Sequence, residues 1–206
     1  FYNGTILAEE GAVQNGYVSI KNGIIEEVGQ GAVPSAFNDY QKINLQDMYL
    51  SPGFIDAHTH GAGGADFMDG TVESILTACR MHVKHGTTTL LPTTLSCFDD
   101  ELFRFFDCFE QARTVTENMP HLPGIHLEGP YFSPAQAGAQ SPECMTVPFP
   151  RHFETVLAHS HGNIRRWSSA PEVPGVIDMG PELLKRGILP SIAHSDADLD
   201  TVMKAY

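Results

Sequence analysis

The sequence predicts an α/β fold of five strand–helix units with parallel strands, preceded by a small antiparallel β-domain. Residues 1–50 contain short runs of β-forming residues separated by turn residues. Residues 51–206 alternate apolar strand-like runs with amphipathic helical stretches. Such alternation favours parallel strands joined by right-handed crossovers. At 206 residues the chain can bury a core, but it is shorter than the roughly 250 residues of a complete (β/α)₈ barrel.

The first domain, 1–50, is expected to form a meander. Its β-forming runs lie at 5–7, 17–20 and 24–28. The Lys-Asn-Gly segment at 21–23 separates the last two runs. Because Asn-Gly readily adopts positive φ, a hairpin turn is predicted there.

The second domain, 51–206, is expected to contain the parallel strands. These are predicted at 53–58, 87–92, 124–127, 164–169 and 188–194. Helices are predicted over 72–84 and 99–116, where apolar residues recur every three or four positions. Another helix over 181–186 should end at Gly187, and a further one should begin near Asp198. The segment 148–150 is interpreted as a loop.

Composition and charge exclude several classes of protein. Twelve Lys and Arg against 25 Asp and Glu give a net charge of −13, which disfavours binding to nucleic acid. No apolar run approaches the ~20 residues of a membrane span, and no signal peptide is evident. The four cysteines are scattered and form no disulfide framework. A cytoplasmic location without membrane attachment is therefore predicted.

The strongest chemical signal is a His-x-His pair at the end of the first parallel strand. His58 and His60 lie two residues apart, so on an extended backbone their side chains share a face. In parallel barrels, functional residues gather at the carboxyl ends of the strands. Two convergent imidazoles there predict a site for a divalent metal.

Two later strands end in residues of the same kind. Glu128 follows the strand at 124–127, and His194 closes the strand at 188–194. Both are predicted metal ligands that face the same cavity as the pair. His126 remains open, as a ligand or as a partner that orients Glu128. The other histidines are interpreted as surface or packing residues: His82, His85, His121, His152, His159 and His161.

At these residues the sequence resembles the amidohydrolase superfamily and, within it, the N-acetylglucosamine-6-phosphate deacetylases. The similarity covers nearly the whole chain. It is carried by PGFIDAHTHG (52–61), HLEGPYFSP (126–134), GAQ (138–140), SAPE (169–172) and AHSDA (193–197). The resemblance implies the first five units of a (β/α)₈ TIM-type barrel after a small β-domain.

The resemblance also implies an activity and a site. The expected reaction is metal-dependent deacetylation of N-acetylglucosamine 6-phosphate, with one or two divalent ions, and Zn²⁺ is the expected metal. Glu128 and His194 match metal ligands of the family, and His58 and His60 match a second-metal pair. Ala139 and Gln140 fall where the family contacts its phosphorylated amino-sugar substrate. A homodimer is expected for the full-length form.

Three functional interpretations remain open at this point. The family's catalytic aspartate and phosphate-binding residues would lie beyond Tyr206, so no catalytic residue is assigned, and the 206 residues alone are expected to be inactive. One alternative is an amidohydrolase acting on a cyclic amide, although the fourth strand lacks the lysine that many of those enzymes use. The other is a catalytically silent metal-binding fragment.

Overall fold

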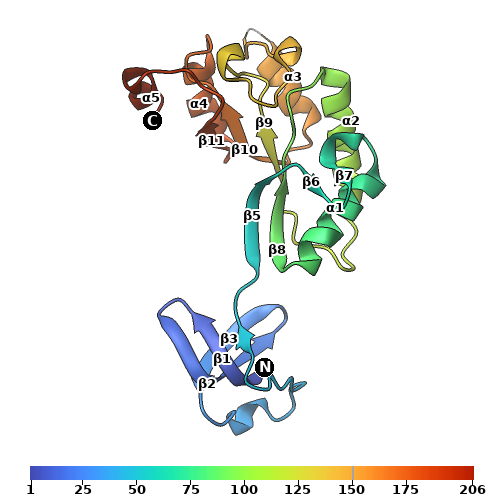
Figure 1. Ribbon diagram of the computed structural model, residues 1–206, viewed down its shortest axis with the longest axis vertical. Helices are drawn as coiled ribbons and strands as arrows, with labels where there is room; N and C mark the ends of the chain where they lie inside the picture. Colours follow the sequence, from blue (N-terminus) through green and yellow to red (C-terminus); the bar gives the residue numbers. More distant parts are fainter. Residues whose placement is uncertain (150) are drawn as a thin grey trace. The chain divides into compact units, whose positions relative to one another are not determined.

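The computed structural model describes residues 1–149 and 151–206 (Figure 1). It divides into two compact units, Phe1–Gly53 and Phe54–Tyr206. The assignment of domains 1–50 and 51–206 stays a prediction. The loop interpreted at 148–150 ends at Pro150, which lies outside the described residues. None of the described helices is long and apolar enough to cross a membrane.

The first unit is a four-stranded sheet in the order β3-β2-β1-β4. Its strands are β1 (Tyr2–Ala8), β2 (Gly11–Lys21), β3 (Ile24–Gln30) and β4 (Tyr49–Leu50). The first three pair antiparallel, and β4 runs parallel to β1. The predicted hairpin turn is present, with φ of 52° at Asn22 and 78° at Gly23. Positive φ at both positions matches the twist of the flanking strands.

The second unit contains parallel strands that are neighbours in the order of the chain. They are β5 (Phe54–Thr59), β8 (Thr87–Pro92), β9 (Ile125–Glu128), β10 (Ile164–Ser169) and β11 (Leu189–Ile192). Parallel ladders join β5 to β8, β9 to β10 and β10 to β11. The strands β5 and β8 form one sheet and β9 to β11 another, and isolated parallel bridges, including one from Thr93 just after β8 to His126 of β9, link the two. A short hairpin, β6 (Gly61–Ala62) and β7 (Ala65–Asp66), follows β5.

Four helices lie between these strands in the chain and bury apolar residues, and a fifth follows the last strand and has no buried residue. They are α1 (Val72–Lys84), α2 (Asp99–Ala112), α3 (His152–His159), α4 (Val176–Lys185) and α5 (Leu199–Ala205). Short 3₁₀ helices span Ser35–Phe37, Phe67–Asp69, Pro134–Gln136 and Pro142–Cys144. Figure 1 shows α1, α2 and α3 along one side of the strands. The core there joins Phe106 of α2 to Leu127 of β9 and Trp167 of β10.

Several boundaries differ from the predicted ones. The helix predicted at 181–186 begins earlier, at Val176, and contains Pro181 in its interior. Val176, Met179 and Leu183 form a buried stripe, so packing outweighs the backbone hydrogen bond that an interior proline removes. The helix predicted to reach residue 116 ends at Ala112. Two other expectations are confirmed: Gly187 follows α4 with φ of 70°, and Asp198 caps α5.

Strand β11 is shorter than predicted, ending at Ile192 and not at residue 194. The physical reason is the backbone of His194, whose φ of 48° is left-handed and incompatible with a strand. The outer strands of this unit also carry exposed apolar side chains. Phe54 and Ile55 on β5 are 69% and 76% exposed, and Leu189 on β11 is 59% exposed.

We predict that Phe106→Ala destabilises the second unit by about 3–5 kcal/mol, because it leaves a cavity among the aromatic rings of α2. Phe106 is 1% exposed and lies beside Phe103 and Phe105. Leu184→Ala, at an exposed position of α4, is the control and should change stability by less than about 0.5 kcal/mol. Urea unfolding measures both. Equal losses would contradict the assignment of this core.

Candidate metal site

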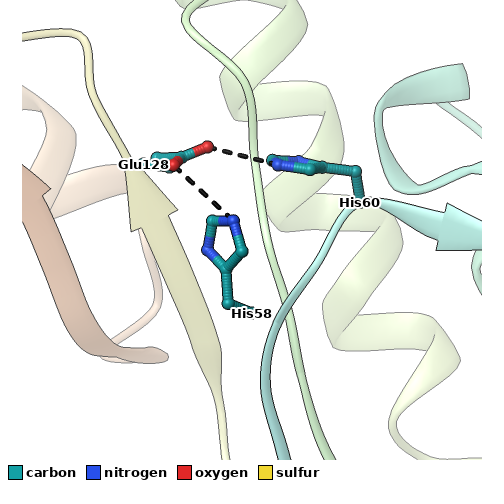
Figure 2. A group of neighbouring side chains, drawn as sticks. All are labelled: His58, His60 and Glu128. Atoms are coloured by element: carbon teal, nitrogen blue, oxygen red, sulfur yellow. Dashed lines mark ion pairs between the residues drawn. The ribbon is translucent and has the colours of Figure 1, made fainter. Parts of the chain in front are cut away.

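The three histidines and the glutamate singled out in the sequence lie at the carboxyl ends of the parallel strands. His58 belongs to β5 and His60 follows it directly, Glu128 is the last residue of β9, and His194 lies just after β11. Figure 2 shows the rings of His58 and His60 directed at the Glu128 carboxylate. The shared strand direction therefore brings together side chains that are up to 136 positions apart in the chain (194 − 58 = 136).

Glu128 is the centre of this group. Its Oε1 atom lies 3.7 Å from Nε2 of His58 and 3.4 Å from Nε2 of His194. Its Oε2 atom lies 3.3 Å from Nε2 of His60. One ligand atom from each of His58, His60 and Glu128 falls within 4.8 Å of the others, and His194 lies outside that tighter group of three.

The Glu128 side chain is buried but held in its charged form. Burial by itself raises its pKa, but the hydrogen bond and charge of His60 and the charges of His58 and His194 outweigh burial, so the pKa lies below its ordinary value. Glu128 in turn raises the pKa of His60. The Glu128 backbone N–H donates to Thr94 Oγ1 at 3.0 Å, which anchors the end of β9.

The contacts of His194 direct one of its ring nitrogens at the Glu128 carboxylate. His194 Nδ1 lies 2.9 Å from the carbonyl oxygen of Gln136. A carbonyl only accepts, so Nδ1 carries the proton and Nε2 is bare in the neutral ring. Bare Nε2 and Glu128 Oε1 then face each other as two acceptors at 3.4 Å. Imidazole nitrogens and a carboxylate are the donors that Zn²⁺ and similar ions prefer, so these residues fit a divalent metal.

The ring of His126 contacts His58 and Ser168. It makes no hydrogen bond to Glu128, so it does not orient that carboxylate by direct contact. Its Nδ1 atom lies 3.2 Å from Nδ1 of His58, and its Nε2 atom lies 2.7 Å from Ser168 Oγ. Burial, with smaller contributions from the charges of Arg166 and His58, lowers the pKa of His126 to about 4. The ring is therefore neutral at physiological pH.

The two predicted substrate residues differ in their surroundings. Ala139 is exposed. Gln140 is buried: its Nε2 donates to Glu128 Oε2 at 2.8 Å, and its Oε1 accepts from the Ser96 backbone N–H at 2.6 Å. Gln140 thus holds the carboxylate in place, which the sequence did not indicate. A substrate role for either residue stays a prediction.

The sequence also missed the residues that support this group. Thr94 and Ser96 follow β8 and hold Glu128 and Gln140, and Gln136 fixes the ring of His194. Thr94 and Ser96 could have been found, because they come directly after a predicted strand, where polar residues of parallel sheets gather. Gln136 had no comparable signal, since its contribution is a backbone carbonyl.

Three of the remaining histidines make side-chain contacts away from Glu128. His82 lies 3.3 Å from Thr59 Oγ1, and His161 lies 3.0 Å from Asp107. His152 bridges Tyr131 and Asp99, with both contacts at 2.8 Å. These contacts join helices to strands or to each other and lie outside the group around Glu128.

Comparison with known proteins finds one consistent family. The Amidohydrolase family matches residues 49–180. The chain is 29% identical over 98% of its length to an N-acetylglucosamine-6-phosphate deacetylase of Lysinibacillus sphaericus, of which it covers 52%. It is 28% identical over 97% of its length to an N-acetylgalactosamine-6-phosphate deacetylase of Shewanella sp. (strain ANA-3), of which it covers 50%.

A solved structure gives the same result. The chain matches the crystal structure of N-acetylglucosamine-6-phosphate deacetylase from Pasteurella multocida with a TM-score of 0.86 at 27% identity, covering 98% of this chain and 52% of that one. This similarity confirms the predicted α/β class. The chain spans about half the length of the relatives that it matches.

We predict that Gln140→Leu destabilises the fold by about 1–3 kcal/mol, because the Ser96 N–H loses its acceptor and Glu128 loses a donor in a buried place. Gln136→Leu is the matched control. Its amide donates to Asp196 on the surface, so a loss below about 1 kcal/mol is expected. Chemical denaturation measures the free energy of unfolding of both variants. Equal losses of stability would show that the buried hydrogen bonds of Gln140 do not stabilise the fold.

We also predict that stability falls as the pH decreases from about 6.5 to about 4. His126 has a pKa of about 4 in the folded chain and 6.5 as its ordinary value, so the unfolded chain binds more protons in this window. The contribution is complete above about pH 6.5, and its loss approaches about 3 kcal/mol near pH 4. His126→Phe should flatten this part of the pH profile, measured with EDTA present. An unchanged slope would refute the prediction.

Proposed function

The chain belongs to the amidohydrolase family, and on that premise we propose that it contributes the metal site of a deacetylase acting on N-acetylglucosamine 6-phosphate. The products are glucosamine 6-phosphate and acetate. The observation that carries this proposal is the buried Glu128 carboxylate, which has three imidazoles around it at the strand ends. The similarity in sequence and fold to deacetylases adds the substrate class.

His58, His60, Glu128 and His194 would hold the divalent ion, which we propose is Zn²⁺. When bound, such an ion supplies Lewis-acid chemistry: it polarises a carbonyl and makes hydroxide available near neutral pH. Glu128 provides the negative charge of the site. Gln140 donates to that carboxylate, and Thr94 accepts from the Glu128 backbone N–H. The Gln136 carbonyl directs the bare nitrogen of His194 toward the carboxylate.

We further propose that the five parallel strands are the first five of an eight-stranded barrel. Their pairing in chain order, with helices as crossovers, supports this. The exposed apolar residues of β5 and β11 also support it, because these strands would then be covered by neighbours. A cytoplasmic location fits the four free cysteines of the described residues. The homodimer stays a prediction.

The direct test is release of acetate from N-acetylglucosamine 6-phosphate by the full-length form, because the 206 residues alone are expected to be inactive. The galactosamine epimer belongs in the same assay, since a relative named for that substrate is 28% identical. A cyclic amide substrate tests the alternative amidohydrolase activity. Hydrolysis should stop with a strong chelator and return with Zn²⁺. Activity that is unaffected by metal removal, or confined to the cyclic amide, would refute the proposal.

We predict that, in the full-length form, Glu128→Gln lowers kcat/KM for deacetylation by more than about 100-fold, because losing a direct ligand should exceed the effect of losing an outer partner. His58→Gln should lose less, since its ring is neutral when it ligates and its side chain is 45% exposed, against 5% for Glu128. Glu154→Gln, on the exposed side of α3, is the control. Metal content is measured for each variant. Comparable losses for Glu128 and His58 would contradict this ranking.

A further inference from the structure

A chain of hydrogen-bonded side chains leads from the interior of the sheet to His58. It begins at Ser168 of β10, passes through His126 of β9 and ends at His58 of β5. The contacts are 2.7 Å from Ser168 Oγ to His126 Nε2 and 3.2 Å between the Nδ1 atoms of the two histidines. Ser168 and His126 are each only 1% exposed. Three strands therefore contribute one residue each.

Binding a cation at His58 would set the direction of every hydrogen bond in this chain. Nε2 of His58 faces Glu128 Oε1, so Nε2 is the nitrogen that must be bare to ligate. The ring proton then lies on Nδ1. Nδ1 faces Nδ1 of His126, which therefore accepts. The proton of neutral His126 is left on Nε2, where it donates to Ser168 Oγ.

We propose that His126 is a positioning residue that holds His58 in the Nδ1–H tautomer, with Nε2 presented to the divalent ion. This rests on the metal site of the proposed function. The His58 side chain is 45% exposed, so its surroundings constrain the ring weakly. Among the described residues, His126 is the side chain that contacts Nδ1 of His58. Partners of this kind fix the tautomer and orientation of ligating imidazoles and increase their basicity.

Two substitutions at His126 separate this role from simple packing. In His126→Asn, the amide oxygen can lie near the position of Nδ1 and accept from His58. In His126→Gln, the longer amide reaches toward Ser168 and leaves no acceptor at Nδ1. We expect His126→Gln to weaken Zn²⁺ affinity by about 10–100-fold, and His126→Asn to recover most of that loss. Competition with a chromophoric chelator measures Zn²⁺ affinity without any assay of turnover.

The control is His152→Gln, which alters a histidine that bonds Tyr131 and Asp99 away from the metal group. It should lower the melting temperature and leave Zn²⁺ affinity unchanged. Long-range ¹H–¹⁵N correlation spectra of the Zn²⁺-loaded, unsubstituted protein give the second readout. They should show the His58 proton on Nδ1 and the His126 proton on Nε2.

Several results would overturn the inference. A proton on Nε2 of His58 would mean that the hydrogen bonds between Ser168, His126 and His58 run in the opposite direction. Two unprotonated Nδ1 atoms would mean that the rings of His58 and His126 share a cation. Equal Zn²⁺ affinities for the Asn and Gln variants would reduce His126 to a packing role. If a variant does not fold, the spectra of the unsubstituted protein still test whether the protons lie on Nδ1 of His58 and Nε2 of His126. Absence of deacetylation by the full-length form, alongside the expected spectra and affinities, would refute the proposed function and leave this inference standing.

Discussion

The buried charge of Glu128 is the constraint on which the rest of the site depends. A carboxylate that is almost excluded from water is strongly unfavourable unless charges and hydrogen bonds compensate it. Here the compensation comes from His58, His60 and His194, together with the amide of Gln140. The three histidines also lower the pKa of Glu128 against the effect of burial. A site built in this way is organised for a cation.

The parallel arrangement of the strands brings the side chains that compensate the Glu128 charge to one edge of the unit. Consecutive strands end at one edge, so β5, β9 and the segment after β11 each deliver a side chain to the same place. The supporting residues come from loops at that edge: Thr94 and Ser96 after β8, and Gln136 after β9. The core meets the site at Trp167, a core residue whose Nε1 donates to the carbonyl oxygen of Gly129, directly after Glu128, at 2.8 Å.

Local sequence patterns predicted the regular elements well where one interaction dominates. The stripe at 72–84 and the apolar strands at 87–92 and 164–169 have the predicted bounds, since burial of one face decides their structure. Prediction was wrong where two local tendencies compete. The helix was predicted to begin at Pro181, but the buried stripe from Val176 extends it through that residue. His194 continued an apolar strand, but its left-handed backbone ends that strand early.

The sequence by itself determined the α/β class, the order of the elements and four residues of the candidate site, because strand ends and metal-binding side chains leave local signals. Only the tertiary structure decided how these residues connect. It placed Gln140 against Glu128, set His126 against His58, and used the Gln136 carbonyl to orient His194. Such contacts join positions distant in the chain, and their geometry depends on side-chain orientation after packing. No local pattern in the sequence encodes that geometry.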